Sequence, residues 1–563
     1  MHSTLSPITR WLPRTEGDAW RPQQKLELPT TTVPLCFDSP ATSIYIGSHP
    51  AHNQHHTDGT EMGKLSYVAA NAIVWPTYAV MLAVASVLAY RLRNVRTFLS
   101  ANGTQKAVPL ALNFIASGLG CGVLLAYPQM ANVAGLQGLL VYVLTSALPM
   151  YVFAFFGPLI KQTCPDGFVL TEWVLRRFGR VAALYLSACT ILTLYLFMVS
   201  EIVSLRLAVQ ALSNIKPIPV VVVQCVVTTI YTAIGGFHIS FVTDSLQATV
   251  VLLLVVVGAV AVGTSVKIDP ARIGPSGLLR PSRLGWQLVY ILTVAIFTND
   301  FFMSGFWLRT FAARSNRDLL LGCSLAAVLL AVVLLLVGVT GLLAVWAGYA
   351  PVADLDSASF FLLLAALPAW ANGVVLALVV VLSTCTLDSF QSALVSTISN
   401  DLFRNRLPPL YARAAVAVVM VPVVVVGLLA TDILAIYLIV DLLSAAVVPV
   451  MLLGFWPRAA RLSAWELIGG GLGGLLCVFV FGAIYYRSAR EGGRLLIIAN
   501  GLYVDDWGTF GAMVVAPLGS LLFAAIIFAL RTAVGRARPG LLKVRARADS
   551  DKLFAASPRT SLT

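Results

Sequence analysis

Polar side chains form a stripe along an otherwise apolar segment, residues 380–403. At about 100° of rotation per helical residue, the stripe covers roughly a third of the circumference and is flanked by Thr386. Its members are Cys385, Asp388, Ser389, Ser392 and Ser396. Hydroxyls in a membrane helix can bond back to the backbone or hold helices together. A carboxylate at membrane depth is costly unless it faces a cavity or a partner. The stripe therefore favours a path for an ion or a solute.

A second segment, residues 108–131, combines glycines and a proline that a uniform helix does not support. Gly118, Gly120 and Gly122 alternate with other residues, and Pro128 follows. We expect the helix to unwind or bend there. In a membrane, irregular backbone is tolerated where it lines a cavity or is buried in protein, and its free carbonyls can bind a cation. Close helix packing through small residues explains the same pattern equally well.

A third segment, residues 286–308, is interrupted by polar residues and a glycine. Asn299 and Asp300 lie near its middle, and Ser304 and Gly305 follow. Two interrupted spans that are five apart in chain order are what an inverted five-plus-five repeat produces. Backbone polar groups are free at such breaks, so we expect the solute to bind there. The residues expected to touch it are Gly118, Gly120, Gly122, Asn299, Asp300 and Ser304.

The elements that position these residues are membrane helices. Of 563 residues, 58% are hydrophobic and 11% are charged, and the mean hydropathy of +0.85 lies far outside the range of soluble domains. No ten-residue segments alternate with period 2, which leaves helices to satisfy the backbone in lipid. The composition predicts an all-α polytopic membrane protein. The eight cysteines show no CxxC spacing, which indicates neither a disulfide framework nor a zinc site.

About thirteen apolar segments are long enough to span a bilayer. We place them at 68–90, 108–131, 137–160, 182–212, 217–234, 241–265, 286–308, 319–348, 369–397, 410–430, 432–455, 465–486 and 509–531. Lys and Arg concentrate in the loops after odd-numbered spans, so we expect those loops in the cytoplasm, the N-terminus outside and the C-terminus inside. This distribution also explains the net charge of +13 better than binding of nucleic acid does.

The spans divide the chain into six parts. These are a disordered extracellular tail (1–66), a first helix with a basic cytoplasmic loop (67–106), a first five-helix repeat (107–266), a second repeat with its connecting loops (267–460), two C-terminal helices (461–534) and a basic cytoplasmic tail (535–563).

Two further carboxylates lie inside apolar spans. Glu201 occurs late in the fourth span, where it has a buried partner or lies near the outer interface. Asp244 follows the pair Gly235-Gly236, which we expect to form a tight turn between spans five and six. A carboxylate near a helix N-terminus is an ordinary choice because it interacts favourably with the helix dipole.

Several stretches resemble the sodium:solute symporter family, which contains sodium-coupled sugar, proline, pantothenate and urea transporters. YTAIGGFHISFVTDSLQ, residues 231–247, is similar to its Gly-Gly…Thr-Asp-x-x-Gln signature, and SGFWLRTFAA, residues 304–313, to its Gly-Phe-Trp-Gln-Arg-x-x-Ala-Ala element. Residues 385–403 resemble its Ser-Thr-Ala-Asp-Ser…Asp-(Ile/Leu)-Tyr element. The resemblance covers roughly residues 95–460. The positions given motif or gating roles are Gly235, Gly236, Asp244, Glu201 and Arg309.

The resemblance implies a LeuT-type bundle that works by alternating access, with a cation where the second span meets the ninth. Carried over residue by residue, its backbone and side-chain ligands fall on Ala116, Leu119, Leu382, Cys385 and Thr386. Cys385 departs from the family's hydroxyl, and a thiol is a poor ligand for a hard cation. Asp388 matches an acidic family position one turn on and could take up a proton instead. We therefore expect Na⁺ or H⁺ as the coupling ion and no other cofactor or metal.

The function expected from the resemblance is secondary active transport, in which a cation and a small polar solute are carried together across the lipid bilayer. The plasma membrane is the expected location, because it is the usual one in the family. Urea is the favoured solute, with Asn113, Asn299 and Ser304 as its partners; a polyamine would use Asp300 and Glu201. An amino acid or a sugar stays open, and so does the oligomeric state. The alternative class is a sensor that binds without transporting. An enzyme is not expected, because no nucleophile elbow or phosphate loop occurs.

Overall fold

A computed structural model describes residues 64–91, 102–352, 359–403, 409–430 and 433–537, apart from 166, 168, 460, 500 and 503–505. Almost all of these residues are helical. The predictions for the N-terminal tail before residue 64 and for the basic tail after residue 537 lie outside the described residues.

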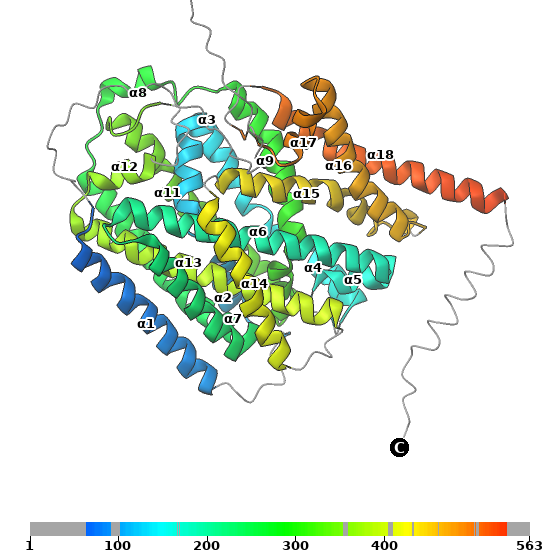
Figure 1. Cartoon of the computed structure of the whole chain (residues 1–563), viewed down its shortest axis with the longest axis horizontal. Coiled ribbons are helices and arrows are strands. Elements are labelled where there is room, and N and C mark those ends of the chain that lie inside the picture. The colour runs from blue at the N-terminus through cyan, green and yellow to red at the C-terminus, as the bar shows by residue number, and fades with distance from the viewer. Residues whose placement is uncertain are drawn as a thin grey trace, which may run out of the picture. The chain divides into compact units, whose positions relative to one another are not determined.

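The helices follow one another with short connections (Figure 1). The first half of the chain contains α1 (Tyr67–Arg91), α2 (Ala107–Gly118), α3 (Val123–Ala147), α4 (Met150–Thr163), α5 (Leu170–Phe178), α6 (Arg180–Leu212), α7 (Pro217–Ser265) and α8 (Pro270–Ser276). The second half contains α9 (Arg283–Phe302), α10 (Ser304–Ala312), α11 (Asn316–Trp346), α12 (Ser359–Ala365), α13 (Ala369–Thr397), a π-helical turn η1 (Ile398–Leu402), α14 (Pro409–Leu429), α15 (Ile433–Leu453), a 3-10 turn η2 (Pro457–Ala459), α16 (Ala464–Tyr485), α17 (Ala489–Leu496) and α18 (Gly508–Ala537).

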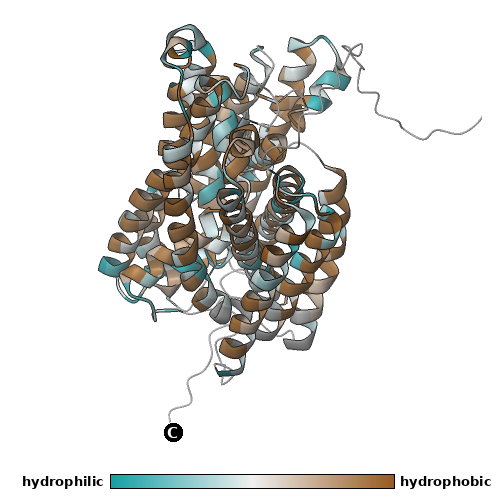
Figure 2. Ribbon diagram, turned by 90° about the vertical axis from the view of Figure 1, so that its left-hand side faces the viewer, coloured by the Kyte–Doolittle hydropathy of each residue, from teal (hydrophilic) through white to brown (hydrophobic). Residues whose placement is uncertain are grey.

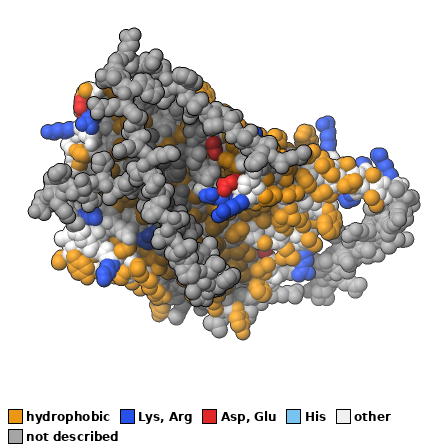
Figure 3. Space-filling view, turned by 45° about the horizontal axis from the view of Figure 1, so that its top comes forward, with side chains coloured by type: hydrophobic (Ala, Val, Ile, Leu, Met, Phe, Trp, Pro, Cys, Tyr) orange, Lys and Arg blue, Asp and Glu red, His pale blue; other side chains and the backbone are white. Residues whose placement is uncertain are grey.

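The helices have the length and surface of a membrane protein. Within the described residues, ten helical segments are long and apolar enough to cross a bilayer, and three shorter apolar ones lie at 107–118, 217–230 and 414–429. Hydrophobic residues dominate the ribbons (Figure 2), and hydrophobic side chains cover a broad area of the surface (Figure 3). Many large apolar side chains are exposed, which suits contact with lipid.

Both predicted helix breaks are present. The first helix pauses after α2, where Leu119 takes extended backbone angles (φ −107°, ψ 94°), and resumes at Val123 in α3. The second pauses between α9 and α10, where Met303 has φ −71° and ψ 109°. The polar and glycine residues at these points leave backbone groups without helical partners, as their sequences predict.

The turn between the second and third spans depends on one glycine. Gly135 interrupts α3 with a φ of +68°, a conformation that L side chains rarely adopt. A β-carbon there would lie 2.3 Å from the carbonyl oxygen of Leu278. The N–H of the next residue, Leu136, donates to that same carbonyl at 2.8 Å. This turn therefore separates the second span (α2 and the start of α3) from the third (the rest of α3 and α4).

α7 carries both the fifth and the sixth predicted spans. α7 is assigned as one helical element, and its two apolar membrane segments, 217–230 and 240–265, lie on either side of the Gly235-Gly236 pair where the turn was expected. The two halves nevertheless fold back past α13. Gln224 and Asp244 both contact α13 between Thr384 and Ser389, although 20 residues of straight helix would separate them by about 30 Å.

α13 forms the centre of the bundle. It is buried along almost its whole length, whereas only 22% of the span in α1 and 28% of that in α18 are buried. It packs against α7, α6, α1 and α2. The polar stripe at residues 385–396 therefore faces protein on every side, and its side chains are buried.

Candidate solute pocket and cation site

A pocket lies between the two helix breaks. Gly118, Gly120 and Gly122 line it from the first break, and Asn299 and Asp300 from the second. Five of the six residues predicted to touch the solute thus share one cavity. The remaining walls come from α3, α4, α6, α10, α11, α13 and α15.

Three carboxylates line this pocket: Glu201 from α6, Asp300 from α9 and Asp441 from α15. Glu201 is 1% exposed and Asp441 is 7% exposed. None of the pocket's lining residues is Lys or Arg, and within the described chain no basic side chain forms an ion pair with any of the three. The pocket therefore holds three carboxyl groups that no basic side chain of the described residues pairs with.

Aromatic rings surround the carboxylates. Tyr127 and Tyr142 are stacked with their centroids 4.1 Å apart and their planes 5° from parallel. Phe197 packs near Tyr437 and Phe390, with centroid distances of 5.6 Å and 5.5 Å. All five rings belong to residues that line the pocket. Aromatic faces attract cations, so the rings and the carboxylates favour the same kind of solute.

Glu201 also reaches the first helix break. Its Oε1 accepts a hydrogen bond of 2.7 Å from the backbone N–H of Cys121. The close approach depends on the neighbouring glycine, because a β-carbon on Gly120 would lie 2.3 Å from Glu201 Oε2. Two positions were left open for Glu201, one beside a partner and one near the outer interface. The structure shows the first, because Glu201 is buried and its partner is the Cys121 N–H.

The predicted cation site is partly assembled where α2 ends beside α13. Thr386 Oγ1 donates to the carbonyl of Leu119 at 2.8 Å, and Cys385 Sγ lies 3.6 Å from the carbonyl oxygen of Ala116. Leu382 precedes Thr386 by one turn on α13 and lies on the same side of the helix. Four of the five ligands carried over from the family thus form two contacting pairs, Thr386 with Leu119 and Cys385 with Ala116.

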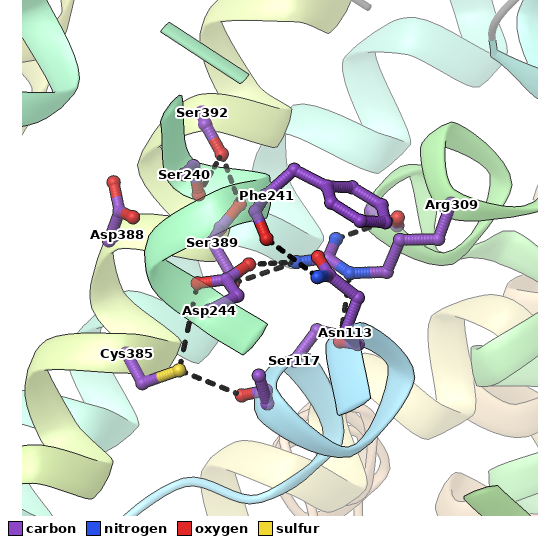
Figure 4. A network of polar contacts seen from close by, with 12 residues as sticks. Asn113, Ser117, Ser240, Phe241, Asp244, Arg309, Cys385, Asp388, Ser389 and Ser392 are labelled. Atoms are coloured by element: carbon purple, nitrogen blue, oxygen red, sulfur yellow. Dashed lines mark hydrogen bonds and ion pairs between the residues drawn. The ribbon is translucent and has the colours of Figure 1, made fainter. Parts of the chain in front are cut away.

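Asp388 does not join this group. Thr232 Oγ1 on α7 donates to its Oδ1, and its Oδ2 is buried with no hydrogen-bond partner in the described structure. Figure 4 shows the side chain directed away from Cys385 and Arg309. Asp388 thus contacts α7 and not the Ala116, Leu119, Cys385 and Thr386 group, and its role in the cation site stays a prediction.

Asp244 is the carboxylate that meets Cys385 instead. Its Oδ1 lies 3.6 Å from the thiol sulfur, and its Oδ2 accepts hydrogen bonds from Arg309 at 2.7 Å and from Ser389 at 3.0 Å (Figure 4). Asp244 is fully buried and pairs with Arg309, a partner that its position near a helix N-terminus did not indicate.

Two other predicted positions lie outside the solute pocket. Ser304 is not among the lining residues; its hydroxyl bonds to Thr397 on α13 at 3.0 Å, because it begins α10 on the side that faces that helix. Asn113 donates to the Phe241 carbonyl at 2.7 Å and to Ser245 at 2.8 Å, so it joins α2 to α7. Two of the three residues proposed for urea therefore do not reach the pocket.

Sequence reasoning missed Asp441. Asp441 lies inside α15, in the predicted span 432–455. An ionisable residue inside a membrane span is itself a signal of function, and this signal could have found it. Asp300 and Asp441 are close enough for their charges to interact.

The comparisons with known proteins agree with this geometry. The chain is 52% identical over 481 residues to the spermidine transporter DUR31 of Candida albicans, a match that covers 84% of this chain and 92% of that protein. No family model matches the chain. Among solved structures, a Na⁺-coupled sialic acid symporter in a substrate-bound, outward-open state is similar, with a TM-score of 0.66 at 16% identity, over 82% of this chain and 97% of that one.

Two interrupted helices around one pocket, on a fold similar to that symporter's, make this an integral membrane protein with a LeuT-type fold, and its 52% identical relative is a transporter. The chain belongs to the sodium:solute symporter family. Its relatives are transporters and not enzymes.

Proposed function

We propose that this protein carries a polyamine such as spermidine across a membrane, together with a coupling cation, by alternating access. The observation that supports this most strongly is the set of three carboxylates, Glu201, Asp300 and Asp441, in a pocket whose lining contains no basic side chain. Buried carboxylates without cationic partners are costly, and a solute with several ammonium groups would offset that cost. The name of the 52% identical relative supports the same solute.

A polyamine also fits the rest of the pocket better than urea does. Its methylene chains would pack against the aromatic rings, and its ammonium groups would lie near carboxylates and ring faces. Urea is neutral and would leave the carboxylates unpaired. The groups expected to bind urea are also dispersed, because Asn113 and Ser304 are bonded elsewhere.

The coupling cation would bind between the Ala116 and Leu119 carbonyls and Thr386. Cys385 supplies sulfur where a hydroxyl is expected. The adjacent Asp244 Oδ1 offers an oxygen, and its contact with the Cys385 thiol is weak. A carboxylate oxygen is a suitable ligand for a hard cation. We favour Na⁺ on this ground, and a proton is the other outcome of the test below.

Uptake into vesicles tests the proposal. Purified protein is reconstituted, and uptake of radiolabelled spermidine is measured with a sodium gradient and a pH gradient imposed separately. We expect saturable uptake that follows the sodium gradient and resists excess urea. Uptake driven only by the pH gradient would assign a proton. Binding of spermidine without any uptake would assign a sensor and contradict transport.

A further inference from the structure

The break between α2 and α3 connects the solute pocket with the cation site through two peptide units. At one end, the Leu119 carbonyl accepts the hydrogen bond from Thr386 Oγ1. At the other end, the Cys121 N–H donates to Glu201 Oε1 at 2.7 Å. Glu201 and Thr386 both line the solute pocket as well. A shift of the Glu201 carboxylate therefore changes the orientation of the peptide that leads to Leu119.

The short link leaves little freedom for the backbone between these two contacts. A β-carbon on Gly120 would meet Glu201 Oε2 at 2.3 Å and Thr386 Cγ2 at 3.3 Å, so the bare backbone passes directly between the two side chains. The segment is held on both sides, by Leu119 N–H bonded to the Ile115 carbonyl at 2.9 Å and by Val123 N–H bonded to the Gly120 carbonyl at 3.2 Å.

We propose that Glu201 is a positioning residue for the cation site as well as a polyamine ligand, and that two separable properties of its side chain perform these tasks. Its negative charge binds an ammonium group of the solute, an assignment that rests on the proposed function. The position of its Oε1 fixes the Cys121 N–H and through it the Leu119 carbonyl that faces the cation. The other two pocket carboxylates, Asp300 and Asp441, come from α9 and α15, and among the described residues no hydrogen bond joins either of them to the break.

Two conservative variants separate the two tasks. Glu201→Gln keeps an oxygen acceptor at the same reach and removes the charge. Glu201→Asp keeps the charge and withdraws the acceptor by one methylene group. Asp441→Glu is the matched control, because it also changes the side-chain length of a pocket carboxylate but has no contact with the break.

Two measurements on the purified protein report the tasks independently. The first is the dissociation constant of radiolabelled spermidine in sodium chloride. The second is the rise in the thermal unfolding midpoint caused by sodium chloride relative to choline chloride, without spermidine, since a ligand that binds the folded state stabilises it.

We expect Glu201→Gln to weaken spermidine binding by about tenfold or more, as for the loss of a charged hydrogen bond, and to keep the sodium-induced rise. We expect Glu201→Asp to lose most of that rise while its spermidine dissociation constant stays within about threefold of the wild type, because aspartate keeps the negative charge that binds the ammonium group. Asp441→Glu should keep the rise.

The opposite pattern overturns the inference. A full sodium-induced rise in Glu201→Asp, its loss in Glu201→Gln, or no rise in the wild type would each show that Glu201 does not position a sodium site. Failure of the wild type to bind spermidine would instead contradict the proposed function, and the sodium measurement would still decide the positioning role.

Discussion

Arg309 and Asp244 form an ion pair that solvent does not reach. Arg309 Nη2 lies 2.7 Å from Asp244 Oδ2, and both side chains are fully buried. The guanidinium also donates to Ser389 Oγ at 2.9 Å and to the carbonyls of Asn113 and Gly305 at 3.0 Å and 2.9 Å. One charged group thus connects α2, α7, α10 and α13 beside the cation site.

Replacing Asp244 by Asn should destabilise the protein strongly. It leaves the Arg309 charge buried without its partner, a change that costs about 3–5 kcal/mol in buried pairs. The measurement is the thermal unfolding midpoint in detergent. The control is Asp269→Asn, which removes the exposed partner of Arg272 and should change stability by no more than about 1 kcal/mol. Equal effects of the two substitutions would show that the buried pair has no special structural role.

Restoring a hydroxyl at residue 385 should strengthen the cation site. In Cys385→Ser, a hard oxygen replaces the sulfur that lies 3.6 Å from the Ala116 carbonyl. One added polar contact of about 0.5–1.5 kcal/mol corresponds to a severalfold lower sodium concentration at half-maximal spermidine uptake. An unchanged or higher sodium requirement would indicate that the Asp244 carboxylate, and not residue 385, determines cation affinity.

Gly135 should not tolerate a side chain. Gly135→Ala places a β-carbon 2.3 Å from the Leu278 carbonyl and forces a residue other than glycine to keep a φ of +68°. Strained backbone of this kind costs about 1–3 kcal/mol before the clash is counted. Gly258→Ala is the matched control, because a β-carbon there meets nothing within 4 Å in α7. We expect a lower unfolding midpoint for the first variant only, and the control should be neutral or stabilised by about 0.5–1 kcal/mol.

The helix breaks were predictable because their cause is local. Glycines at residues 118–122 and polar residues at 299–304 disfavour continuous helix wherever they fold. The two breaks face one pocket, as the five-span spacing of an inverted repeat suggests.

The partners of the buried charges were not predictable in the same way. Asp244 and Arg309 are 65 positions apart, and Thr232 and Asp388 are 156 positions apart. Which face of α13 each residue occupies depends on how α7 folds back against it, which no local pattern specifies. The preference for urea lacks support for a related reason, since the positions of Asn113 and Ser304 outside the pocket depend on tertiary packing.

The most direct test of the polyamine pocket is equilibrium binding of radiolabelled spermidine to purified wild-type protein and to Asp441→Asn, with unlabelled urea as competitor. The acidic pocket predicts saturable binding that urea does not displace, weakened about tenfold or more in the variant by loss of one charged contact. Displacement by urea, or equal affinity of the two proteins, would contradict recognition of a polyamine by these carboxylates.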